Sequence, residues 1–187
     1  MSIRHQWVSI FVLGFAVLLA AAPQQQKPSG TPAGTAAAKA KASVDPALAA
    51  AAKEFQATGC DASLWKHVYN PQRLIVVEPC ISVTGTIHHV KREADGDDHI
   101  QLQLDPQYAR LLNDRNKTAQ ADCLILEPIC QNPVTQPDAI KACRDFHSPV
   151  EVPGGHVHVK VLGSYVLDSE AGNGWMEIHP VTSMVPE

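Results

Sequence analysis

Residues 156–183 read HVHVKVLGSYVLDSEAGNGWMEIHPVTS and predict two β-strands joined by a Gly-rich turn. In the first strand, Val157, Val159 and Val161 alternate with two His residues and a Lys. This period of two is typical of a strand with one face in the core and the other toward solvent.

The second of these strands carries the candidate site. Met176 and Ile178 are expected to point into the core, so the opposite face presents Trp175, Glu177 and His179 side by side. Trp175 can pack at the mouth of a barrel or serve as a stacking platform. Together the three side chains could bind a ligand, or Glu177 and His179 could simply form a solvated strand face.

The N-terminal residues predict export. Residues 1–22 have a basic start, an apolar run and small residues before Pro23, which are the features of an export signal. An uncleaved anchor is the alternative, disfavoured because the apolar run is shorter than the roughly 20 residues needed to cross a bilayer. Residues 23–44 predict a disordered linker rich in Ala, Pro and Gln, and residues 45–187 a single domain. We therefore expect a periplasmic or secreted protein.

Export suggests that some of the five cysteines are oxidised, because thiols can form disulfides in an oxidising compartment. Short spacing predicts the disulfides Cys60–Cys80 and Cys130–Cys143, with Cys123 left free. The alternative is that all five are reduced and buried.

Three further strands and several short helical segments are expected between the linker and residue 156. The predicted strands are residues 73–90, interrupted at Pro79-Cys80, and residues 99–104 and 123–129. The predicted helical segments are residues 46–57, 106–113 and 137–144, and residues 114–121 predict a polar loop. The fold class is therefore all-β with short helices. Three strands, a helix and two more strands favour a five-stranded, OB-fold-like Greek-key barrel over a β-sandwich, which usually has about seven strands.

Several motifs carry a family resemblance. They are LWKHVYNPQRL at residues 64–74, EADGDDH at 93–99, PVTQPDA at 133–139, GSYVLD at 163–168 and WMEIHPV at 175–181. In combination the chain resembles a family of exported bacterial domains marked by D-G-D-x-H and W-x-E-I-H-P-V. The resemblance implies export and an OB-fold-like domain, but it does not point to any particular catalytic activity.

The two hairpin loops of such a barrel rise at the same rim and commonly hold the ligand. Here they are residues 91–98 and 168–174, and both are acidic. The predicted ligand-binding residues are Asp97, His99, Asp168, Trp175, Glu177 and His179. No resident cofactor is expected, although His99, Glu177 and His179 are candidate ligands for a divalent cation such as Ca²⁺ or Zn²⁺. The alternative is an ordinary hairpin turn beside a solvated strand face.

The charge of the chain and the absence of known catalytic motifs narrow the range of possible functions. The chain beyond Ser43 contains all 19 Asp and Glu but only 11 of the 15 Lys and Arg, so its formal charge is −8. Such a negative charge repels phosphate and disfavours nucleic acid as a partner. The chain has no G-x-S-x-G, no phosphate-binding Gly loop and no H-E-x-x-H. The sequence thus predicts a non-catalytic binding module of the cell envelope, with an unidentified envelope ligand or protein partner. A small metal-dependent hydrolase that uses the acidic barrel rim is the alternative.

Overall fold

The computed structural model describes residues 43–187. The predicted export signal, residues 1–22, and the predicted linker up to residue 42 lie outside the described residues. Within residues 43–187, no helix is long and apolar enough to cross a membrane.

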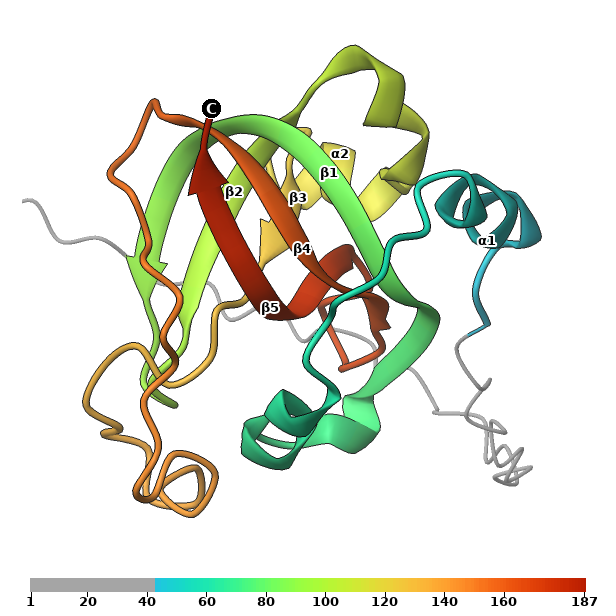
Figure 1. Ribbon diagram of the computed structural model, residues 1–187. Coiled ribbons are helices and arrows are strands. Elements are labelled where there is room, and N and C mark those ends of the chain that lie inside the picture. The colour runs from blue at the N-terminus through green and yellow to red at the C-terminus, as the bar shows by residue number, and fades with distance from the viewer. Residues whose placement is uncertain (1–42) are drawn as a thin grey trace, which may run out of the picture. The chain divides into compact units, whose positions relative to one another are not determined.

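Five strands close into one barrel in the order β1-β2-β3-β5-β4 (Figure 1). The strands are β1 (Leu74–Arg92), β2 (Asp98–Leu104), β3 (Leu124–Leu126), β4 (His158–Asp168) and β5 (Met176–Pro186). β3 and β5 are parallel, and the other neighbouring pairs are antiparallel. The prediction of a five-stranded, mostly β domain with short helices is confirmed.

The long strand β1 pairs with both of its neighbours in the closed barrel, β2 and β4. It pairs with β4 along most of its length and with β2 through its second half. Its register against β4 shifts between Val76 and Ile81, so the interruption predicted at Pro79-Cys80 is an irregularity within a continuous strand. Such bulges bend a strand and increase its twist, which helps a sheet to close.

The barrel interior follows the predicted alternation. Ile81, Val83 and Ile87 of β1 are fully buried, as are Met176 and Ile178 of β5. They pack with apolar residues from β2, β3 and β4 in one hydrophobic cluster. Burial of this apolar surface is the main term that stabilises the fold.

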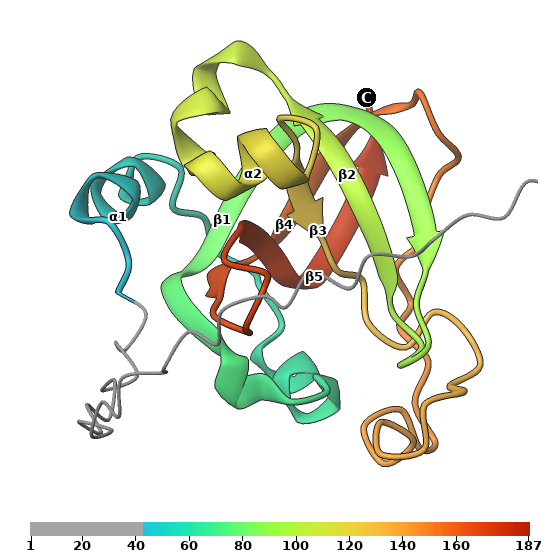
Figure 2. The same cartoon turned by 180° about the vertical axis from the view of Figure 1, so that it is seen from behind.

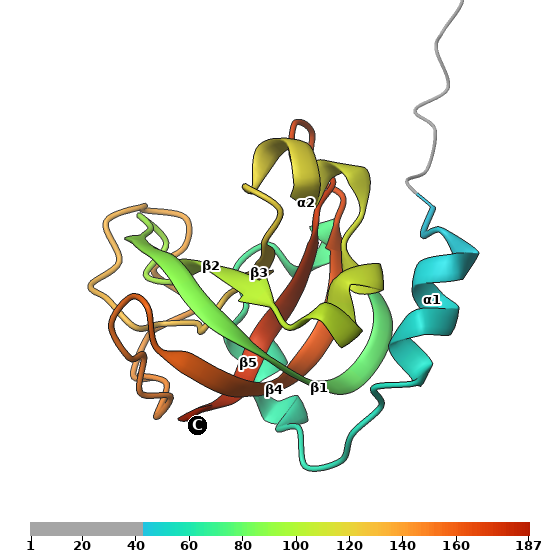
Figure 3. The ribbon, with the colours of Figure 1, turned by 90° about the horizontal axis from the view of Figure 1, so that it is seen from above.

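Short helices cover the outside of the barrel. α1 (Pro46–Lys53) begins with Asp45, whose side chain accepts a hydrogen bond from Ala47 N, and it packs beside β1 (Figure 3). The 3₁₀ helices are η1 (Ala62–His67), η2 (Pro71–Arg73) and η3 (Pro106–Leu111). α2 (Asp114–Ala119) lies near β2 and β3 when the molecule is seen from behind (Figure 2).

The sequence predictions were wrong in three connecting segments. Residues 114–121, predicted as a loop, contain α2, because the Asn113 side chain forms a capping box with Asn116. Residues 137–144, predicted as a helix, form turns instead. The strand predicted at residues 123–129 is only Leu124–Leu126, since Pro128 has no N–H to extend the pairing.

Both predicted disulfides are present. Cys60 pairs with Cys80 and Cys130 with Cys143, and Cys123 is free and buried. The second bridge joins two residues of the long connection between β3 and β4, drawn in orange in Figure 1, and its Cys143 Sγ lies 3.8 Å from Asp95 O in the β1–β2 turn.

Candidate functional site

A polar pocket of about 600 Å³ lies on the face of the sheet opposite the core. We call it the acidic pocket. Its lining residues are Tyr69, Arg73, His89, Lys91, Glu93, Asp95, His99, Gln101, Gln120, Glu127, Gln136, Asp168, Glu170, Asn173, Trp175 and Glu177. A larger cavity of about 760 Å³ beside α1 is lined by apolar side chains and by exposed charges such as Glu54 and Arg110. Buried titratable groups gather in the acidic pocket and not in this cavity.

Strand alternation places the pocket side chains. On β2, Ile100 and Leu102 face the core, so His99 and Gln101 face the pocket. The same alternation on β5 turns Glu177 toward the pocket. β3 lies between β2 and β5, so one face of three neighbouring strands forms the pocket wall.

The β1–β2 turn supplies the acidic residues on one side. Glu93 N donates to Asp97 O (2.9 Å), and Asp97 N donates to the Asp95 side chain (3.2 Å). Gly96 has φ +101°, which favours glycine, and its carbonyl accepts from Gln131 N (2.7 Å). The turn is therefore fastened to the β3–β4 connection.

Asp168 organises the β4–β5 turn rather than presenting a free carboxylate. Its side chain accepts hydrogen bonds from Glu170 N (2.8 Å) and Asn173 Nδ2 (2.7 Å). It also pairs with Arg73 Nη1 at 2.5 Å. Burial raises the pKa of Asp168, and the neighbouring Glu177 raises it further. Because both carboxylate oxygens accept hydrogen bonds, the role of Asp168 in the turn is structural.

Trp175, Glu177 and His179 form a hydrogen-bonded row. Trp175 Nε1 donates to Glu177 Oε1 (2.6 Å), and His179 Nδ1 lies 3.3 Å from Glu177 Oε2. Glu177 and His179 are 1% and 0% exposed. The alternative in which these two side chains solvate a strand face is therefore wrong, because the loops bury that face.

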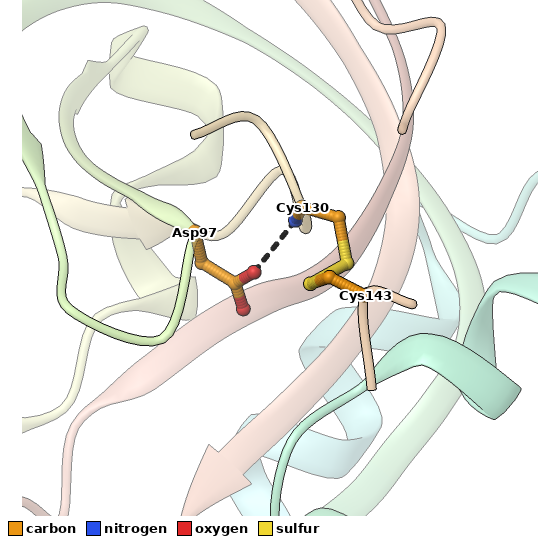
Figure 4. A group of neighbouring side chains, drawn as sticks. All are labelled: Asp97, Cys130 and Cys143. Atoms are coloured by element: carbon orange, nitrogen blue, oxygen red, sulfur yellow. Dashed lines mark hydrogen bonds between the residues drawn. A yellow bond between two sulfur atoms is a disulfide. The ribbon is translucent and has the colours of Figure 1, made fainter. Parts of the chain in front are cut away.

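Asp97 lies behind this row, next to a disulfide (Figure 4). Its carboxylate accepts a hydrogen bond from Cys130 N (2.7 Å) and lies beside the Cys130–Cys143 bridge. His179 Nε2 lies 3.9 Å from Asp97 Oδ2 and has no hydrogen-bond partner among the described residues. Burial raises the pKa of Asp97 to about 7, although His179 acts to lower it.

Glu127 and His99 form a second mostly buried pair that faces the pocket, after Arg73 and Asp168. Glu127 Oε1 lies 2.8 Å from His99 Nδ1, with side-chain exposures of 7% and 14%. Burial raises the pKa of Glu127 well above its usual range, and the neighbouring carboxylates of Glu177 and Asp97 raise it further. The crowding of carboxyl groups therefore makes Glu127 hold a proton more readily than it would in water, and a bound cation would favour its charged form.

The described residues include two groups with three metal-type ligand atoms within 4.8 Å of one another. The first is Asp97, Cys130 and Cys143, whose sulfurs are joined in a disulfide and cannot act as thiolate ligands. The second is Glu93, His99 and Glu127. The predicted cation set of His99, Glu177 and His179 is not among these groups.

The structure brings most of the predicted residues together. His99, Asp168, Trp175 and Glu177 line the acidic pocket, while the other two predicted residues, Asp97 and His179, lie buried behind it. Sequence reasoning missed several lining residues, among them Arg73, Glu93, Gln120 and Glu127. A signal was present for Glu127, the single charge within the apolar run LILEPI at residues 124–129.

Comparison with known proteins does not assign the chain to a family. No protein-family model matches it, and no curated protein or solved structure matches it significantly.

Proposed function

We propose that this protein is a non-catalytic binding module of the cell envelope with an OB-fold-like barrel, and that its ligand carries positive charge. The strand order β1-β2-β3-β5-β4, with β3 parallel to β5, supports the OB-fold. In that fold the faces of the second and third strands and the two hairpin loops bind ligands, and the acidic pocket involves the same elements.

The observation that carries the proposal is the charge of the pocket lining. Six carboxylates line it, against one Arg and one Lys. Arg73 is itself paired with Asp168, so it does not neutralise Glu127 or Glu93 by direct contact. A cation entering this pocket would be attracted by several carboxylates, three of which are almost fully buried, where water screens them least.

Binding fits the side chains better than catalysis. Within the described residues, the pocket lining contains no Ser, Thr or Cys that could act as a nucleophile. Trp175 offers an aromatic surface beside the carboxylates, and its ring meets His99 edge-on with 6.1 Å between ring centroids. Aromatic rings beside carboxylates are a common way to bind an ammonium group.

Envelope location is part of the proposal. Two disulfides and the finding on membrane-spanning helices are compatible with export. The export signal and the family resemblance remain predictions. Expression in a bacterium of residues 1–45 fused to a reporter that is active only outside the cytoplasm tests export, and an inactive, cytoplasmic fusion would contradict it.

Ligand titration tests the binding function. The purified oxidised protein is titrated with spermidine, a Lys-rich peptide and divalent cations, with Trp fluorescence and calorimetry as readouts. We expect binding by at least one of these cations that weakens with salt and with Glu177→Gln, because both reduce the attraction of the carboxylates. Glu187→Gln, an exposed carboxylate outside the pocket, is the control. Equal binding of anionic and cationic probes would contradict the proposal.

A metal-dependent hydrolase is the second candidate, and the position of Arg73 favours it. Arg73 lines the same pocket as the carboxylates, so it could stabilise the negative charge of a phosphoester transition state. Turnover of nucleic acid or generic esters that needs a divalent metal and is lost in both Glu177→Gln and Arg73→Lys would place this function first.

A further inference from the structure

We propose that Glu93, His99 and Glu127 bind one divalent cation of the Zn²⁺ type. This inference rests on the proposed function, since it names the cation for which the acidic pocket is built. The three side chains come from the β1–β2 turn, the start of β2 and the residue after β3. One ligand atom from each lies within 4.8 Å of the other two.

The distances suit a small ion. Ligand atoms about 2.1 Å from a tetrahedral Zn²⁺ lie roughly 3.4 Å from one another. His99 Nδ1 and Glu127 Oε1 are 2.8 Å apart, so these two atoms must move apart by about 0.6 Å to admit the ion between them. Glu93 completes the triangle from the solvent side, where its ion pair with Lys91 (2.8 Å) is largely exposed and exchangeable.

The hydrogen bonds around His99 leave the correct nitrogen free. Gln101 Nε2 donates to Gln120 Oε1 (3.3 Å), which fixes that amide oxygen next to the imidazole. His99 Nε2 lies 3.3 Å from the same oxygen and donates its proton to it. The second ring nitrogen, Nδ1, faces Glu127 Oε1 and is the nitrogen that loses its proton when an ion binds between them. Histidine ligands of metals are usually held in this way, with the other ring N–H bound to an acceptor.

Glu127 supports the site by its position as well as its charge. Its side chain is 7% exposed, and among the described residues its one side-chain hydrogen-bond contact is between Oε1 and His99 Nδ1 (2.8 Å). Oε2 therefore has no partner in the described part of the chain, although Glu127 lines the pocket. Oε2 is not one of the fully buried atoms, so it is accessible from the pocket, where a bound cation would offset the desolvation cost of this mostly buried carboxylate.

Neighbouring groups are less suitable as ligands. Both oxygens of Glu177 have partners, in Trp175 and His179. His179 Nε2 faces Asp97, which lies behind the pocket lining. One imidazole and two carboxylates, with space for water in the pocket, favour a Zn²⁺-type ion over Ca²⁺, which prefers six to eight oxygen ligands.

Calorimetry and NMR test the site together. The oxidised protein is stripped of metal with a chelator and titrated with Zn²⁺, while the ring nitrogens of the His residues are followed by NMR. We expect one Zn²⁺ per chain and a shift of Nδ1 of His99, assigned with His99→Gln. The affinity should fall at least about 100-fold in Glu127→Gln and His99→Gln, and less in the more exposed Glu93→Gln. Glu187→Gln should bind as the wild type does.

The outcomes separate this inference from the proposed function. If Zn²⁺ fails to bind while spermidine or the Lys-rich peptide still does, the metal site is wrong and the cation-binding pocket stands. If no cation binds, both are wrong. Undiminished Zn²⁺ affinity in a folded Glu127→Gln protein, or a response only from other His residues, also overturns the site. Unfolding curves of each variant show that it is folded, and Glu93→Gln tests the site without changing a buried group.

Discussion

A single carboxylate in an apolar run, Glu127, shows how burial changes the meaning of a residue. Leu126, the residue before it, is fully buried in the main core, so alternation turns Glu127 to the opposite side of the sheet. There it meets His99, which sequence reasoning had selected for another reason. The sequence could predict which face each residue takes, but it could not show that loops cover the polar face and exclude water from it.

Asp97 should make stability fall with rising pH in the metal-free protein. Its folded pKa of about 7 is above the value in the unfolded chain, so between about pH 4 and 7 the folded state binds more protons. Asp97→Asn keeps an acceptor for Cys130 N and removes the charge. We expect this variant to be more stable than the wild type by on the order of 2 kcal/mol at pH 8, with little difference at pH 4.

Urea unfolding at several pH values measures this effect. Asp145→Asn is the matched control, because Asp145 is exposed and has a positive φ that Asn also adopts. A difference between Asp97→Asn and the wild type that grows toward low pH would contradict the assignment.

At the scale of elements, α2 depends on one buried amide. Asn116 Nδ2 donates to Cys123 O and Met176 O (both 2.9 Å), and its Oδ1 accepts from Met176 N (2.8 Å). A short polar helix of six residues has little stability of its own, so these contacts hold it. They come from residues distant in sequence, and for this reason the segment looked like a loop.

Removal of this amide should weaken the fold. Asn116→Ala leaves Met176 N and two carbonyls without partners, and we expect a loss of about 3 kcal/mol in the free energy of unfolding. Chemical denaturation measures it. Lys117→Ala, at an exposed position of the same helix, should change stability by less than about 0.5 kcal/mol. Similar losses of stability in both variants would show that helix propensity, rather than the buried hydrogen bonds of Asn116, stabilises α2.

Gly163 should tolerate no side chain. It lies where the β4–β5 register shifts, and a Cβ there would lie 2.5 Å from Pro180 O and against the Ile178 side chain. Gly163→Ala is therefore expected to destabilise the barrel by about 3 kcal/mol, since backbone must move. Gly154→Ala, where a Cβ meets nothing within 4 Å, is the control in the same thermal unfolding series. An unchanged melting temperature for Gly163→Ala would contradict the close approach.

At the scale of the whole molecule, predictions succeeded where residues follow a repeating pattern. Alternation located β1, β2, β4 and β5, and short spacing gave both disulfides. Prediction failed in the connection at residues 131–157. Its turns depend on contacts with the distant β1–β2 turn, such as Thr135 N and Gln136 N donating to Ala94 O (both 2.8 Å).

The two disulfides should differ in their effect on ligand binding. Each closes a short loop, so replacing either pair by Ser should cost about 3 kcal/mol of stability. Only loss of Cys130–Cys143 frees the connection that packs on the β1–β2 turn, so only this variant should weaken cation binding. Denaturation and cation titration of both double variants measure the two effects. Equal cation affinities in the two folded double variants would contradict a role of the Cys130–Cys143 bridge in ligand binding.

The shortness of β3 has a consequence for motion. β3 contributes only Leu124–Leu126 to the sheet, and the backbone of Glu127 and Pro128 adds a few bonds to β2 and β5, so this shortest strand is where the barrel can open most easily. Opening would also separate the pocket wall, because His99 is on β2, Glu177 on β5 and Glu127 next to β3. A ligand bound to side chains of these three strands would hold the strands together and oppose this opening. Amide hydrogens of Leu124, Ile125 and Leu126 would then exchange with solvent more slowly in the bound protein than in the free protein.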